Sequence, residues 1–253
     1  MTVFVIRRLM QAALVVLIMS LLVFGGVFLV GDPVEMLVAD DADQAEREAI
    51  IKSMGLDLPF YMQYLRFIGN ALQGDMGNSF VFQESAMHLI AERMPATFEL
   101  AFAALFIAVV LGIPLGIYAG LNANSWISKT IMTSSILGFS LPTFWVGIMM
   151  ILFFAVIMGW LPSSGRGDTV DVFGIPISLL TLDGLSHMLL PAVNLALFKL
   201  SMVIRLARAG TREVVHQDYI KFARAKGLSD TRIIGVHLFK NIMIPVVTVL
   251  GLE

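Results

Sequence analysis

Long apolar runs that carry almost no charge are the feature that most constrains this chain. They cover residues 9–30, 100–121, 131–160, 188–206 and 242 onward. At about 1.5 Å of rise per residue, a helix over 9–30 is about 33 Å long, which is enough to cross a hydrocarbon core of about 30 Å. In lipid the backbone polar groups have no water to bond, so a spanning segment satisfies them within a helix. The runs therefore predict an all-α, polytopic membrane helical bundle.

Composition agrees with a lipid solvent, because 58% of the residues are hydrophobic and only 14% are charged. Soluble domains have about 45–50% and about 25%. The chain contains no cysteine, which excludes disulfides and thiolate metal sites. The first run is longer than the about 7–15 apolar residues of a signal peptide and ends at Gly31-Asp32-Pro33, so we expect a retained helix. The fifth run is too short to span, so we expect four full spans plus a cut fifth, in a chain truncated at its C-terminus.

The charges of the polar segments predict the orientation of the chain. Segment 32–96 has eleven acids and four bases, whereas segment 205–240 has eight bases and three acids. An excess of Lys and Arg near helix ends marks the cytoplasmic side. Arg7, Arg8 and Lys129 then also lie inside. We expect a cytoplasmic N-terminus and an extracytoplasmic segment 32–96.

Three regions follow from this topology. Residues 1–31 are the cytoplasmic N-terminus and first span, residues 32–96 a small helical insertion between spans 1 and 2, and residues 97–253 the core. Helices are expected in the insertion over 43–54, with Gly55 as its stop, and over 60–72. The insertion is either a solvated cap or a surface that meets an extracytoplasmic partner. Glu99, at the outer end of the second span, is expected at the membrane interface.

Residues near Pro142 predict a bend in the third run. Pro142 removes one helical hydrogen bond and presses on the carbonyl of Gly138, where a glycine leaves room for a kink. Ser140 lies beside this proline and Phe144 follows it. We expect these four residues at a hinge or along a pathway. Pro114 is as consistent with an ordinary membrane helix as with a kink.

Lys199 is the charged residue placed well inside a predicted span. A charge at the bilayer centre costs about 2.5–3.5 kcal/mol on insertion scales, and such residues often mark a pathway. The alternative is that its long side chain reaches the interface from a position about 10 Å from the end of the run. Both readings stay open.

The basic segment, at about 207–241, contains a predicted helix–glycine–helix unit. Asp218 is expected to cap a short helix, Lys226 to suit its negative end, and Gly227 to adopt the left-handed conformation that stops it. Ser229 is then expected to cap a second helix that leads toward the fifth run. A rigid pair of this kind suits a groove on a soluble partner.

These motifs together resemble the permeases of ABC transporters, and among them the dipeptide/oligopeptide/nickel subgroup. In the general permease pattern the coupling loop begins with Glu-Ala-Ala. This chain has Lys221-Phe222-Ala223 ahead of Gly227 instead, and that departure is typical of the subgroup. Gly74-Asp75-Met76-Gly77 and Glu92-Arg93-Met94-Pro95 also fit it. The resemblance implies that residues of the loop contact an ATP-binding subunit, namely Asp218, Tyr219, Ala223, Arg224, Ala225, Lys226 and Gly227.

The resemblance also implies partners and a location. A second homologous permease would complete the pathway, two ATP-binding subunits would dock beneath it, and an extracytoplasmic binding protein would deliver substrate. The chain would be a multi-pass protein of a bacterial inner membrane, in contact with lipid and not with nucleic acid. Peptides are the expected substrate, with nickel, opines and sugars as alternatives. No cofactor and no metal site is implied.

A membrane-embedded enzyme and a channel are the two alternative classes of protein. A membrane-embedded enzyme would carry paired histidines or acids in its spans, but the four histidines are scattered (His88, His187, His216 and His237). The chain also has no Gly-x-x-x-x-Gly-Lys-Ser/Thr phosphate loop, so we expect ATP hydrolysis in separate subunits and no catalytic residue here. A channel would need no coupling loop.

Overall fold

The computed structural model describes residues 2–30, 44, 48, 51–52, 55–79, 81–82 and 84–251. The chain divides into two compact units, Met1–Arg93 and Met94–Glu253. Gly31-Asp32-Pro33 lies outside the described residues, and so does most of the helix expected over 43–54.

The first unit contains two helices that pack on each other. Helix α1 (Thr2–Val30) begins seven residues before the apolar run, and α4 (Phe60–Ala71) confirms the helix expected over 60–72. The Phe24 ring lies 5.5 Å from the Phe60 ring and 5.6 Å from the Tyr64 ring, measured between centroids. The Tyr64 hydroxyl also lies 2.8 Å from the Ser20 hydroxyl. The insertion therefore holds an amphipathic helix against the first span.

The second unit is built around α5 (Ala86–Leu121) and α8 (Leu182–Val214). These two helices pack closely on each other through a face of glycines on α5. Gly112, Gly116 and Gly120 recur every four residues on α5, so they share one face of the helix. A Cβ atom at Gly116 would lie 2.5 Å from Ala207 Cβ, and one at Gly120 would lie 2.5 Å from Thr211 Cβ. Small residues at this spacing let two backbones approach closely in a membrane.

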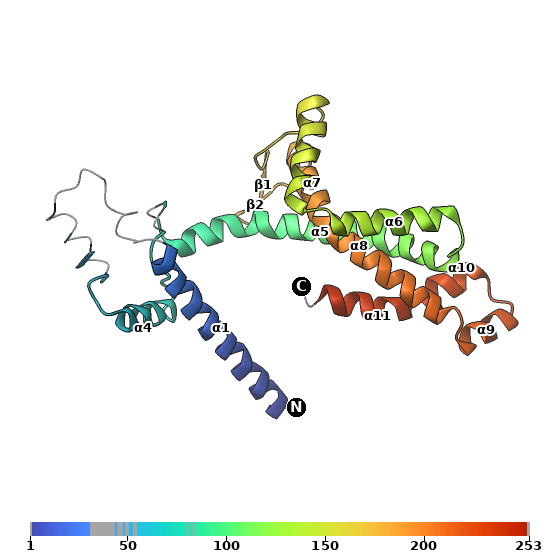
Figure 1. Ribbon diagram of the computed structural model, residues 1–253, viewed down its shortest axis with the longest axis horizontal. Helices are drawn as coiled ribbons and strands as arrows, with labels where there is room; N and C mark the ends of the chain where they lie inside the picture. The colour runs from blue at the N-terminus through green and yellow to red at the C-terminus, as the bar shows by residue number, and fades with distance from the viewer. Residues whose placement is uncertain are drawn as a thin grey trace. The chain divides into compact units, whose positions relative to one another are not determined.

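The remaining helices pack around this pair (Figure 1). Helix α6 (Trp126–Ser140) lies along α8, and α7 (Thr143–Met150) continues as a π-helix, η1 (Ile151–Ile157). A two-stranded antiparallel hairpin follows, made of β1 (Val170–Val172) and β2 (Ile175–Ile177). After α8 come α9 (Asp218–Ala225), α10 (Asp230–Arg232), the π-helix η2 (Ile233–Leu238) and α11 (Phe239–Leu250).

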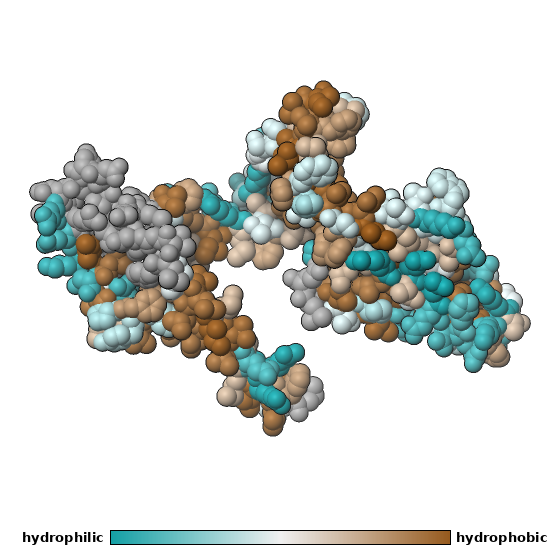
Figure 2. Space-filling model, in the orientation of Figure 1, coloured by the Kyte–Doolittle hydropathy of each residue, from teal (hydrophilic) through white to brown (hydrophobic). Residues whose placement is uncertain are grey.

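The buried core of this unit joins α5, α8 and the last helical run. Its fully or nearly fully buried members are Ile113, Val203, Ala207, Leu238, Ile242 and Val246. Most other apolar side chains of the spans point outward, and Figure 2 shows brown, hydrophobic surface along α1 and teal surface at the end that carries α9. Within each unit, apolar side chains that face outward along a helix are typical of a protein whose solvent is lipid.

Among the described residues, four helical segments are long and apolar enough to cross a membrane, namely Thr2–Gly26, Ala86–Leu121, Leu182–Val214 and Asp230–Leu250. The all-α polytopic fold is therefore confirmed. The helix expected after Ser229 and the fifth apolar run form one continuous helical segment, Asp230–Leu250, which has the length of a span, so the expectation of a run too short to span is corrected for the described residues. Only its first turn, Asp230–Arg232, is entirely polar, and apolar residues follow from Ile233 onward.

The third run, expected over 131–160 with a bend near Pro142, is bent much more sharply than a kinked single helix. It consists of two helical parts, Trp126–Ser140 and Thr143–Ile157, that meet at an angle of 105°. Helix α5, by contrast, continues through both Pro95 and Pro114. Proline alone therefore does not decide where these helices break.

The glycine face makes a testable prediction about packing. Gly116→Ala places a methyl group against the α8 backbone, 2.7 Å from the Ile204 carbonyl oxygen, so the helices must separate. Overpacking of this kind costs about 1–3 kcal/mol. We expect a lower thermal unfolding midpoint of the purified protein in detergent.

The matched control is Gly235→Ala, because no atom lies within 4 Å of the added Cβ at this helical position. Alanine is a better helix former than glycine, so the control should leave the midpoint unchanged or raise it. An equal loss in both variants would contradict the packing explanation.

Candidate functional site

The short helix α9 ends in a backbone motif that fixes its geometry. Gly227 has φ +76°, its amide donates to the Arg224 carbonyl at 2.9 Å, and the Leu228 amide donates to the Ala223 carbonyl at 3.2 Å. These are the two hydrogen bonds of a Schellman motif, which needs a left-handed residue after the helix. The predicted stop at Gly227 and the helix–glycine–helix unit are both present.

A small apolar cluster anchors this unit to its neighbours. Ile220 and Ala223 of α9 are buried against Ile233, with Val214 and Leu228 packed beside them. The Asn241 amide nitrogen also donates to the Tyr219 hydroxyl at 3.0 Å, which joins α9 to α11. Helix α9 is therefore fixed both to the end of α8 and to the last helical run, as Figure 1 shows.

The outward face of α9 combines two exposed aromatic side chains, Tyr219 and Phe222, with several charges. Phe222 is 62% exposed, and the Lys226 ammonium lies 4.6 Å from the centre of its ring. Lys221 Nζ donates to Asp218 Oδ1 at 2.8 Å. This hydrogen bond and the lysine charge hold the pKa of Asp218 below its usual value, so the interaction is present at neutral pH and is lost as pH falls through that lowered pKa.

One detail of this helix differs from the sequence expectation. Asp218 does not cap α9: Gln217 occupies the N-cap position, and Asp218 is the first helical residue, turned toward Lys221. Ser229 does occupy the N-cap position of α10, without a side-chain hydrogen bond to the backbone. Phe222, which the sequence did not single out, is the most exposed large hydrophobic residue of α9.

The bend in the third run lies at the residues expected to form it. Helix α6 ends at Ser140 and Pro142 is the N-cap of α7, so the break spans Leu141 and Pro142. The Ser140 hydroxyl donates to the Ile136 carbonyl at 2.9 Å, and Phe144 is 70% exposed just beyond the break. Their role as a hinge stays a prediction.

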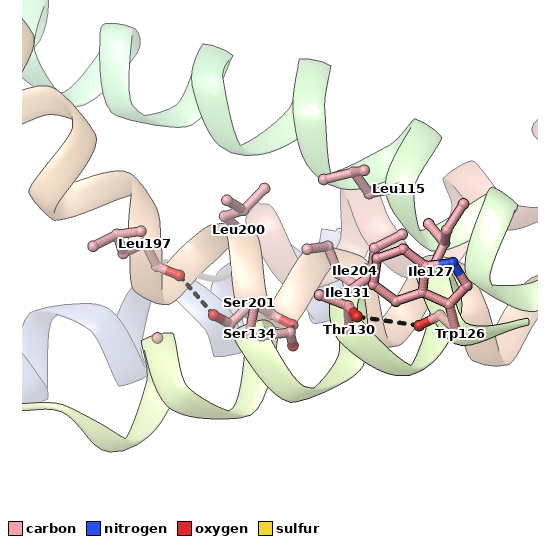
Figure 3. A pocket seen from close by; sticks show the side chains of 12 residues that line it. Leu115, Trp126, Ile127, Thr130, Ile131, Ser134, Leu197, Leu200, Ser201 and Ile204 are labelled. Atoms are coloured by element: carbon pink, nitrogen blue, oxygen red, sulfur yellow. Dashed lines mark hydrogen bonds between the residues drawn. The ribbon is translucent and has the colours of Figure 1, made fainter.

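Beside the bend, α6 and α8 enclose an apolar groove of about 360 Å³, drawn in Figure 3. Gly138 lines it, and a Cβ there would lie 3.0 Å from Ser201 Oγ. The buried Ser135 hydroxyl donates to the Ser201 carbonyl at 3.3 Å and ties the two helices together. Lys199 is half-buried on α8 but does not line this groove, so the predicted pathway residues are not all gathered in one place.

A second polar site, which the sequence did not reveal, surrounds Glu99. This carboxylate is only 8% exposed and accepts hydrogen bonds from the Ser178 amide at 2.7 Å, the Ser178 hydroxyl at 2.6 Å and the Leu179 amide at 3.0 Å. Arg166 pairs with it at 2.8 Å and also donates to the Pro176 carbonyl at 2.6 Å. Glu99 is therefore buried within the protein and bonded at both carboxylate oxygens, and its place at the membrane interface stays a prediction. It clamps the segment around the hairpin onto α5.

The described residues form several membrane-length helices, a bent helical pair and a polar unit of α9 and α10 that apolar contacts hold in place. These features are those of a polytopic membrane protein of the permease class. Residues 112–253 match the family described as "Binding-protein-dependent transport system inner membrane component", and residues 1–101 match its N-terminal counterpart. The chain belongs to this family. It is a multi-pass inner membrane permease subunit of a binding-protein-dependent transport system.

Curated relatives cover most of the chain. It is 37% identical to the di/tripeptide transport system permease protein DppB of Pseudomonas aeruginosa, over 92% of this chain and 74% of that protein. It is 38% identical to the dipeptide transport system permease protein DppB of Haemophilus influenzae, over 98% of this chain and 79% of that protein. It is also 35% identical to the glutathione transport system permease protein GsiC of Escherichia coli, over 99% and 77%.

The Glu99 clamp predicts a local loss of protection when its charge is removed. Glu99→Gln exchanges a buried acceptor for an amide that pairs poorly with Arg166 and with the two backbone donors. Hydrogen bonds to a charged group contribute about 1.5–3 kcal/mol each, so opening of this segment should become much easier. We expect faster amide hydrogen exchange at Ser178 and Leu179 in the purified protein.

Asp171→Asn serves as the control, since this acid lies exposed on β1 of the same hairpin. It should leave exchange at Ser178 and Leu179 unchanged. Unaltered exchange in Glu99→Gln would show that the hairpin is held by other contacts.

Proposed function

We propose that this chain forms half of the translocation pathway of an ATP-driven importer for peptides. A second, homologous permease forms the other half, two ATP-binding subunits hydrolyse ATP, and an extracytoplasmic binding protein delivers the substrate. The observation that carries the proposal is the arrangement of α9 and α10, which we call the knuckle. One face of the knuckle is exposed, and its other face is buried against the rest of the unit.

The knuckle has the mechanical properties that coupling requires. Its buried face contacts Ile233, from which a continuous helical run extends to Leu250. That run packs through Leu238, Ile242 and Val246 on α8 and α5. A displacement of α9 by a soluble partner is therefore passed to the spans through packed side chains and not through a loose loop.

The exposed side of the knuckle suits a protein groove. We assign contact with the ATP-binding subunit to Tyr219, Arg224, Ala225 and Lys226, with Phe222 as the apolar anchor. Asp218, Ala223 and Gly227 act by shaping α9, because Ala223 is buried and Gly227 has the required positive φ. Aromatic and arginine side chains are enriched among the residues that dominate interfaces.

Peptide is the favoured substrate class. The relatives named above are peptide and glutathione permeases, and glutathione is itself a peptide derivative. Nickel, opines and sugars are the alternatives, and the binding protein does most of the selecting between them. The charge pattern supports an orientation with the N-terminus and α9 in the cytoplasm and segment 32–96 outside.

The test of coupling is co-purification of the full-length transporter, expressed with its ATP-binding subunits. Phe222→Ala removes the more exposed aromatic ring of α9, so we expect at least a tenfold loss of affinity for the ATP-binding subunits and loss of ATP-driven transport. Phe106→Ala, at a similarly exposed ring of α5, should keep both.

A wild-type chain that inserts normally but retains no ATP-binding subunit would contradict the proposal and favour a channel. If the ATP-binding subunits bind Phe222→Ala as tightly as wild type, only the role of Phe222 as the apolar anchor is contradicted.

The role of Lys199 is tested separately. We propose that its ammonium lies along the pathway, so Lys199→Met should lower peptide uptake by about tenfold in proteoliposomes that contain the complete transporter, while Lys199→Arg, which keeps the charge, should retain most of it. Uptake that is unchanged in Lys199→Met would favour a side chain that only reaches the interface.

A further inference from the structure

The hairpin between η1 and α8 has an unusual tip. Strand β1 pairs with β2 in the register Val170 with Ile177 and Val172 with Ile175, which leaves Phe173 and Gly174 as a two-residue turn. Their φ values are +54° and +81°, as in a type I′ turn. Such turns strongly favour Asn-Gly, because most side chains are strained at positive φ. Phenylalanine is an unfavourable residue at this position.

The side chain of Phe173 gains nothing within the chain from this strained position. Its exposure is 101%, the highest among the large hydrophobic residues of the described part. A phenyl ring in the left-handed region, held entirely in solvent, satisfies neither turn geometry nor core packing. The feature is explained if the ring is used in contact with another molecule.

The base of the hairpin is held firmly, so the tip is presented and not free to fold back. Glu99 bonds the amides of Ser178 and Leu179 directly after β2, and Arg166 bonds the Pro176 carbonyl within it. On the other side, the Thr181 hydroxyl donates to the Asp168 carbonyl at 2.7 Å, just before β1. Preorganisation of this kind lowers the ordering cost of binding.

The charges around the tip point to the nature of the partner. Residues 167–182 contain Asp168 and Asp171 but no lysine or arginine. The nearby Arg166 is already bonded to Glu99. Membrane-interface anchors combine Trp or Tyr with Lys or Arg, and residues 167–182 contain none of these four residue types. An acidic hairpin with an apolar tip instead fits an apolar pocket rimmed by basic side chains on a soluble protein.

We propose that this hairpin docks the extracytoplasmic binding protein, with the Phe173 ring as its anchor. The proposal rests on the proposed function, which places the loop outside the membrane and makes the binding protein a partner. The clamp at Glu99 positions the anchor and does not itself touch the partner.

The decisive variant is Phe173→Asn in the complete transporter, reconstituted in nanodiscs. Asparagine is the residue that a type I′ turn prefers, so the variant removes the ring while keeping or improving the fold of the hairpin. We expect the Kd of the purified binding protein to rise by at least tenfold, with basal ATP hydrolysis unchanged. Leu182→Asn, at an exposed apolar residue that begins α8, should bind as wild type does.

Binding of Phe173→Asn that equals wild type would overturn the proposal, and so would equal losses in the two variants. If the binding protein fails to stimulate ATP hydrolysis even in the wild-type transporter, the proposed function itself is contradicted. The two failures are therefore distinguishable.

A spin label separates docking from insertion into lipid. The 253 residues contain no cysteine, so Phe173→Cys introduces one labelling site among them. We expect a water-soluble nickel chelate to relax the spin label strongly. Addition of the binding protein should reduce this relaxation, because the docked protein shields the label. Preferential relaxation by oxygen, with no effect of the binding protein, would place the tip in the bilayer and overturn the proposal.

Discussion

The close approach of α5 to α8 supports the rest of the second unit. In hydrocarbon, apolar side chains gain little by leaving lipid for one another, so helix association depends on dispersion contacts at short range. The glycine face of α5 makes those contacts possible, because Gly112 lies against Val203, Gly116 against Ala207 and Gly120 against Thr211. The core residues of α11 then pack on the pair and extend it to a third helix.

Helix α8 connects the two elements that we propose as recognition sites. Directly after its C-terminal end lies α9, whose buried face is apolar and whose outer face is basic and aromatic. Before its N-terminal end lies the hairpin, whose base is fixed by a buried carboxylate and whose tip is a single ring. Both are held by dense local contacts. A rigid rod between two rigid recognition elements suits a protein that must relate events on one side of a membrane to events on the other.

How much of this could be predicted depends on how local each signal is. Gly227 was predictable, because a Schellman stop is encoded within a few residues, and the break at Pro142 was predictable for the same reason. The angle of that break was not, since both helical parts pack on α8, which begins 40 residues after Pro142 in sequence. The fifth span was expected to be too short because the apolar run was counted only from residue 242, whereas the helix that Ser229 begins continues into it without a break.

The Glu99 clamp shows the limit most clearly. Its partners are 67 to 80 residues away in sequence, and neither periodicity nor composition contains that pairing. A lone glutamate at the end of a span has the same local pattern whether it is solvated or buried. Likewise, the exposed positions of Phe222 and Phe173 depend on which faces the fold leaves uncovered, and only the structure reveals them.

The π-helical turn η2 has a consequence for how α9 is attached. Ile233 and Leu238, at its two ends, are both buried, although five residues apart they would lie on well-separated faces of a regular α-helix. The wider turn accommodates one extra residue and keeps both side chains on the inner side. Losing that residue would rotate everything before it by about 100° relative to α11. The number of residues in this one turn thus determines how α9 and α10 are rotated about the helix axis relative to α11. Insertions and deletions change that number, whereas substitutions do not.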